Sequence, residues 1–114
     1  MGDARVTLLR LLKKGDVDGF HAAARKAGHA PSLDGETIKG ASLTGFDLSR
    51  FDLSNVEFED CIISTVAMRE TRLDGAYIHG CTLMDCDLSG ASLDGASFEG
   101  CVFRRSNLSA VVLA

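Results

Sequence analysis

Residues 86–95 read CDLSG ASLDG, two five-residue units that each place a leucine at the third position. The same spacing continues without a break along most of the chain, and every position on this register is large and apolar. An amphipathic helix repeats its apolar positions about every 3.6 residues and a strand about every two, so a period of five matches neither. It indicates a repeat architecture in which each unit turns one corner. These seventeen positions, called the centres below, are Leu33, Ile38, Leu43, Leu48, Leu53, Phe58, Ile63, Met68, Leu73, Ile78, Leu83, Leu88, Leu93, Phe98, Phe103, Leu108 and Leu113.

Small or compact residues occupy the position two before most centres. Because side chains alternate along an extended segment, this position and the centre face the same side, which we expect to be the interior. The residues between them are mostly polar, and glycine often stands two positions after the centre, where a tight corner needs a positive φ. Glu36, Phe46 and Phe51 depart from the small inward pattern, all near the first coil. We interpret them as a wider end layer against which another element packs.

Residues 1–30 lack the five-residue period and are predicted to form two short helices. The first extends over about residues 4–13 and the second follows an N-cap residue, Asp16. Since a stack of coils cannot end in water with its last apolar layer bare, we expect these helices to cap the repeat. The apolar stripe expected on the first helix comprises Val6, Leu9 and Leu12, widened by Leu8 and Leu11.

The runs ASLTG at residues 41–45, CDLSG at 86–90 and ASLDG at 91–95 resemble units of the pentapeptide-repeat family. That family's pattern is roughly a small residue, then Asp, Asn or Ser, then Leu or Phe, a polar residue and Gly. The resemblance implies an all-β solenoid, a right-handed quadrilateral β-helix with about 20 residues per coil and about four coils here. The expected domains are an N-terminal helical cap at residues 1–30 and the β-helix at residues 31–114.

The charge of the chain argues against a broad basic surface for nucleic acid. Lys and Arg total 12 against 16 Asp and Glu, and the sequence pI is near 5.2. The imbalance is local, because residues 1–30 carry a net charge of +3 and residues 31–114 carry −7. Neither a secretory signal nor a membrane-spanning stretch is recognisable, so we expect a cytoplasmic protein.

All four cysteines occupy the small inward position. Cys61, Cys81 and Cys101 are spaced by twenty and therefore stack on one side of the coil, while Cys86 lies one corner away from Cys81. No CxxC metal motif occurs, and parallel side chains on neighbouring rungs hold their Cβ atoms too far apart for a disulfide. We interpret these thiols as packing residues, because a buried free cysteine behaves as a small hydrophobe.

A spacing of twenty residues, or a multiple of it, also aligns outward carboxylates in two columns, called the acidic columns below. Asp34, Asp74 and Asp94 share the first, whereas Asp47 and Asp87 share the second. Like charges on adjacent rungs repel each other and favour a cation or a basic partner. The alternative is a solvated surface that keeps a stacked β-structure from associating.

No catalytic constellation is recognisable in the sequence. His21, His29 and His79 have no Cys or Ser nucleophile at a suggestive spacing, and no phosphate-binding loop, dinucleotide fingerprint or metal motif occurs. A stack filled by Leu, Ile and Phe leaves no internal cavity for a substrate. We therefore predict that the protein is not an enzyme, with neither a cofactor nor a metal.

The last residues remain in register, and we expect Leu108, Val111, Val112 and Leu113 to form an open end. An uncovered coil presents unpaired backbone groups and an apolar layer, which invites strand addition or end-to-end pairing. A symmetric homodimer through this end is the expected solution, since closed two-fold pairing is the commonest. A different protein covering this end and a lost C-terminal segment remain as alternatives.

Three functional hypotheses follow. The first is a non-enzymatic interaction or scaffold module that recognises a protein partner of unknown identity. The second follows from the resemblance, because some pentapeptide-repeat proteins bind type II topoisomerases such as gyrase through an acidic rod that mimics DNA, which confers quinolone resistance. The arginines Arg50, Arg69, Arg72, Arg104 and Arg105 and the short rod disfavour it. The third is DNA binding by the basic helical segment.

Overall fold

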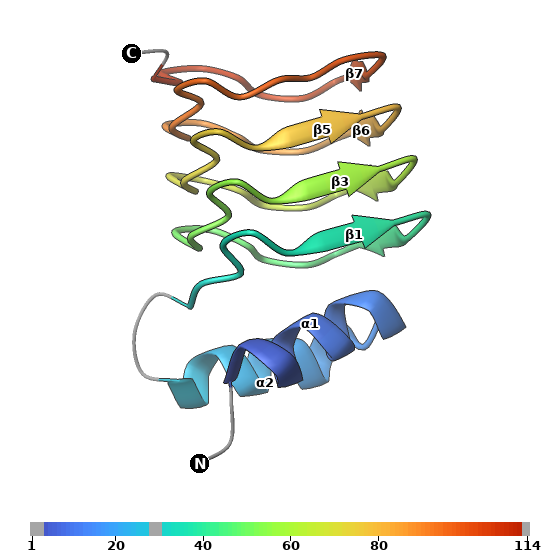
Figure 1. Ribbon diagram of the computed structural model, residues 1–114, viewed down its shortest axis with the longest axis vertical. Helices are drawn as coiled ribbons and strands as arrows, with labels where there is room; N and C mark the ends of the chain where they lie inside the picture. Colours follow the sequence, from blue (N-terminus) through green and yellow to red (C-terminus); the bar gives the residue numbers. More distant parts are fainter. Residues whose placement is uncertain (1–3, 28–30, 113–114) are drawn as a thin grey trace.

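The computed structural model describes residues 4–27 and 31–112. Two helices lie next to each other across one end of a stack of β-coils, with residues 102–104 at the opposite end (Figure 1). No helix in residues 4–27 is long and apolar enough to cross a membrane. The helices are α1 (Ala4–Lys14) and α2 (Val17–Ala27), and the strands are β1 (Thr37–Lys39), β2 (Ser42–Thr44), β3 (Glu57–Glu59), β4 (Ile62–Ser64), β5 (Tyr77–His79), β6 (Thr82–Met84) and β7 (Val102–Arg104).

Every pairing between coils is parallel and joins residues that are twenty apart. One side of the stack is the sheet β1-β3-β5 and the next is the sheet β2-β4-β6-β7. The other two sides are held by isolated parallel bridges. One of these ladders runs from Ser32 to Val112 in four steps of twenty residues. The structure therefore confirms a four-sided parallel β-solenoid with a short helical part at its N-terminal end.

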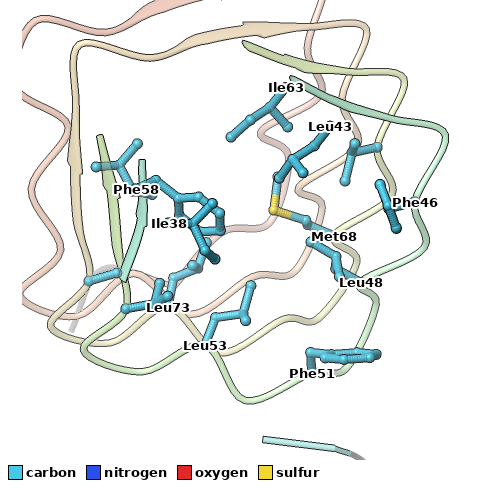
Figure 2. Packing of buried hydrophobic residues seen from close by; sticks show 14 of the residues in the cluster. Ile38, Leu43, Phe46, Leu48, Phe51, Leu53, Phe58, Ile63, Met68 and Leu73 are labelled. Carbon is cyan, nitrogen blue, oxygen red and sulfur yellow. The ribbon is translucent and has the colours of Figure 1, made fainter. Parts of the chain in front are cut away.

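The centres fill the interior of the solenoid. In Figure 2, the labelled side chains from different sides of the coil converge on one another, among them Ile38, Leu53 and Ile63. All the centres from Leu33 to Leu88 are at most 3% exposed. The period of five thus places one large apolar side chain on each side of each coil, and these side chains are buried from water.

The corners of the coils have a positive φ whether or not they carry glycine. Gly45 has a φ of 80°, and Thr65, one coil above it at the same corner, has a φ of 53°. Asp85 and Arg105 continue this corner with φ values of 54° and 49°. The left-handed conformation is therefore a property of the repeat position, and glycine is the residue that adopts it at least cost.

The two helices cover the first coil, as predicted. Phe20 of α2 is fully buried, with its ring edge-on to Phe46 at 5.2 Å and stacked on Phe51 at 5.4 Å. The carboxylate of Glu36 reaches the guanidinium of Arg5 in α1 at 3.7 Å. Glu36, Phe46 and Phe51, which depart from the small inward pattern, therefore all contact the helices that cover the first coil.

One expectation about α1 is wrong. Val6 was expected in the buried stripe, but it is 60% exposed, whereas Leu8 and Leu12 are fully buried. These two leucines are four residues apart and so share one face of the helix, which packs on the coil. Val6 lies on another face, because α1 has apolar residues on more than one side.

Candidate interaction surfaces

The apolar layer at the end of the solenoid is open. Phe103 is 36% exposed and Leu108 is 40% exposed, whereas Leu83 and Leu88, the corresponding centres one coil below, are fully buried. The difference arises because no residue of the described ranges stacks on Phe103 or Leu108. The rings of Phe98 and Phe103 pack together with their centroids 5.4 Å apart. We call three centres of the last coil the C-terminal end layer: Phe98, Phe103 and Leu108.

The other residues predicted at this end have different environments. Val112 is 50% exposed, and its backbone N–H donates to the carbonyl of Ala91 at 2.9 Å. Val111 is partly buried and packs against the core. Leu113 lies outside the described residues. The structure thus places Leu108 and Val112 on the surface and Val111 beneath it.

The backbone of the last coil has donors with no coil above them. In the coil below, the N–H of Ile78 donates to Ser97 at 2.7 Å and that of Leu88 donates to Asn107 at 2.8 Å. By the same pattern the N–H groups of Phe98 and Phe103 point away from the stack, where no described residue accepts from them. An edge of this kind is ready to pair with another strand.

The first acidic column is partly neutralised by its own neighbours. The Asp74 carboxylate accepts from the hydroxyl of Ser92 and from the backbone N–H of Asp94 at 3.1 Å, and it lies 4.0 Å from Arg72. Asp34 accepts from the side-chain amide of Asn55 at 3.3 Å. Asp74 therefore bonds to the coil above it instead of facing Asp94 as a free charge.

The second acidic column has a structural role that spacing alone did not reveal. Asp47 and Asp87 each accept a hydrogen bond at 3.0 Å from the backbone N–H two residues later, at Ser49 and Ser89. This is the local turn that Asp forms readily with its own backbone. The bonds from Ser89, together with the charge of Arg69 at 3.5 Å, hold the pKa of Asp87 below its usual range.

The inward cysteines donate to the coil below. The thiols of Cys61 and Cys86 lie 3.4 Å and 3.3 Å from the carbonyls of Ile38 and Ile63. Burial raises the pKa of Cys86. The backbone N–H of Cys61 approaches the sulfur of Cys81 at 3.3 Å, so the stacking of these residues is confirmed. All four cysteines are free thiols, and no cluster of potential metal ligands occurs among the described residues.

Two features of the helical part were not anticipated. The Nε2 atom of His21 accepts a hydrogen bond from the backbone N–H of Asp47 at 2.8 Å, which ties α2 to the solenoid. A groove of about 620 Å³ also runs along α1, bordered by Val6, Leu9 and Glu36 among others. Neither feature has a sequence signal of its own, because both depend on how the helices sit against the first coil.

Comparison with known proteins gives one family match and several similar structures. The family profile described as pentapeptide repeats matches residues 52–90 and 81–113, with eight copies of the repeat. A search of curated proteins finds no significant match.

The similar solved structures are distant in sequence. A pentapeptide repeat protein from the thylakoid lumen of Arabidopsis thaliana is 19% identical, with a TM-score of 0.41 over 68% of this chain and 64% of that protein. The pentapeptide repeat protein Rfr23 from the cyanobacterium Cyanothece 51142 is 22% identical, with a TM-score of 0.35 and the same coverage. QnrB1, a plasmid-mediated fluoroquinolone resistance protein, is 18% identical, with a TM-score of 0.37 over 71% of each chain. The match to the first two thus spans slightly less than two thirds of their length.

Proposed function

The chain belongs to the pentapeptide-repeat family, and from that premise we propose that it is a non-enzymatic interaction module that pairs end to end with a second copy of itself. The observation that carries this proposal is the exposure of the C-terminal end layer, since Phe103 and Leu108 would be buried if one more layer covered them. The N-terminal end of the solenoid has its cover in α1 and α2, so the two ends are not equivalent.

The size of the end bounds the strength of the contact. The molecule measures 37 × 26 × 21 Å, so its cross-section limits the contact to about 500 Å² on each copy, near the lower bound for a specific interface. We therefore expect a dimer with a dissociation constant on the order of 10 μM instead of an obligate dimer.

A second copy is the occupant that best fits this end. A two-fold contact lays the same surface on itself, so an apolar layer always meets an apolar layer. The two-fold also reverses the direction of the facing coil. The N–H and C=O groups at the edge of one copy would then meet those of an antiparallel partner strand.

Sedimentation equilibrium of the purified protein over about 1–200 μM tests this proposal. We expect the mass to rise from one chain to two across this range. The substitution Leu108→Asp places a charge in the contact and should weaken association at least about tenfold. The matched control is Ile62→Asp, because Ile62 is 49% exposed but lies on a side of the rod, in β4.

Two results would overturn the proposal. One is a single-chain mass at every concentration. The other is equal weakening by Leu108→Asp and Ile62→Asp, which would mean that association does not use the end layer. Circular dichroism of both variants shows whether the β-solenoid is retained.

Mimicry of DNA toward a type II topoisomerase is less well supported. The hydrogen bonds and arginine contacts of Asp74 and Asp87 reduce the free negative charge along the acidic columns. A gyrase supercoiling assay separates the two functions, since an interaction module of the kind proposed leaves supercoiling unchanged at about 50 μM.

The proposal places the protein in the cytoplasm. The support is chemical, because Cys101 is a partly exposed free thiol, as is usual in a reducing compartment.

A further inference from the structure

Helix α1 exposes one apolar side chain, Val6, that the solenoid does not cover. Leu8 and Leu12 face the coil and are fully buried, but Val6 is 60% exposed and Leu9 is only partly buried. No residue of the described ranges covers Val6. A helix in a small protein normally turns its exposed face to water with polar residues.

This face continues as a strip of positive charge. One side of the helix carries Val6 and the residues three, four and seven positions after it, which are Leu9, Arg10 and Lys13. Together with Lys14 and with Glu36 of the first coil they border the groove of about 620 Å³. Glu36 lies 3.7 Å from Arg5, so its charge is offset. The groove is thus apolar at one end and cationic at the other.

We propose that this groove binds an amphipathic helix of another protein that carries an apolar anchor followed by carboxylates. Helix-in-groove recognition needs an apolar concavity of this kind, and the cations at the end of α1 select an acidic partner by charge complementarity. This site is at the opposite end of the molecule from the C-terminal end layer and does not depend on dimerisation.

Other anionic partners fit this surface less well. A nucleic acid would need a continuous basic track, but the chain has a net charge of −4 and the solenoid next to the groove is acidic. A membrane surface is flat and receives apolar residues that protrude from a helix. The groove along α1 is shallow, and its border includes the carboxylate of Glu36, which disfavours the phosphates of a nucleic acid or of an anionic membrane.

Fluorescence anisotropy with a labelled synthetic peptide tests the proposal. The probe is an amphipathic helical peptide of about 18 residues with leucines at helical spacing on one face and glutamates beside them, and its counterpart has lysines in place of the glutamates. We expect the acidic peptide to bind with a dissociation constant below about 100 μM at moderate salt, and the basic peptide to bind at least about tenfold more weakly.

The chain offers a matched pair of variants for this test. Lys13 and Lys14 lie in the last turn of α1, and Arg25 and Lys26 lie in the last turn of α2. The double variant Lys13→Glu with Lys14→Glu should weaken peptide binding at least about tenfold. The double variant Arg25→Glu with Lys26→Glu makes the same change of charge outside the groove and should weaken it less than about threefold. The substitution Val6→Gln tests the apolar end without changing charge, and it should also weaken binding.

Several outcomes would overturn the proposal. These are failure of the acidic peptide to bind, equal weakening by the two double variants, or an unchanged affinity in Val6→Gln. A fourth is tighter binding of a single-stranded oligonucleotide or of anionic phosphatidylserine vesicles than of the peptide, if the double variant Lys13→Glu with Lys14→Glu loses that binding. Circular dichroism of each variant controls for loss of fold.

Discussion

At the small inward position, a hydroxyl or thiol finds its partner in the coil below. Thr71 is fully buried, and its hydroxyl donates to the carbonyl of Leu48 at 2.6 Å. Cys61 and Cys86 donate to carbonyls in the same relation, 23 residues earlier in the chain. A buried polar group is costly without such a bond. The repeat therefore accepts Thr, Ser or Cys beside Ala because its geometry supplies an acceptor.

This geometry predicts how the thiols react. Cys86 is 2% exposed, whereas Cys101 in the last coil is only partly buried, and burial also raises the pKa of Cys86. Because the thiolate is the reactive form, iodoacetamide at neutral pH should modify Cys101 at least about tenfold faster than Cys86 in the native protein. Peptide mass spectrometry over a time course measures both rates. Modification of Cys86 as quickly as of Cys101 before the protein unfolds would contradict this expectation.

At the scale of the element, each five-residue unit depends on its corner. Gly45 has a φ of 80°, and a Cβ built there would meet no atom within 4 Å. Its surroundings thus tolerate a side chain, but its backbone conformation disfavours one. At this corner a substitution therefore tests the cost of the backbone conformation without an added steric clash.

The substitution Gly45→Val is predicted to destabilise the protein by about 1–2 kcal/mol, because a β-branched residue is strained in the left-handed region. The substitution Gly45→Asn adds a side chain of similar size but should cost less than about half as much, since Asn adopts this region more readily. Urea unfolding followed by circular dichroism measures both free energies. Equal losses in the two variants would show that the corner is limited by space instead of conformation.

The sequence predicted the solenoid better than its helical cover. The period of five fixes which side chains face inward, so the register of twenty residues and the stacking of Cys61 on Cys81 followed directly. The face of α1 that meets the coil did not follow, because α1 has apolar residues on several sides. Only the packing of Leu8 and Leu12 on the first coil decides the orientation and leaves Val6 exposed.

The candidate surfaces were predictable to different degrees. The register assigns Leu108 to the last coil, and no residue of the described ranges stacks on it. The contacts of the Asp74 and Asp87 carboxylates do not follow from the register. They depend on hydrogen bonds from the backbone N–H groups of Asp94 and Ser89 and on the positions of neighbouring arginines. A column of carboxylates in a sequence therefore overstates the free charge on the folded surface.

At the scale of the whole molecule, helices cover one end of the solenoid (Figure 1), and no described residue covers Phe103 and Leu108 at the other end. Helices with a net positive charge close the first coil, with Phe20 buried against Phe46 and Phe51. At the other end the C-terminal end layer has no such cover within the described residues. Contacts between neighbouring coils dominate stability in solenoids, so the last coil is expected to be the least stable.

Amide hydrogen exchange measured by NMR at low and high protein concentration tests this asymmetry most directly. At about 5 μM we expect slow exchange in the inner coils, at Leu73 and Ile78, and fast exchange at Phe98 and Phe103, whose N–H groups face away from the stack. At about 500 μM the exchange of Phe98 and Phe103 should slow as the end layers of two copies meet. Slow exchange at Phe98 and Phe103 in the dilute protein, or fast exchange that concentration does not change, would contradict the account.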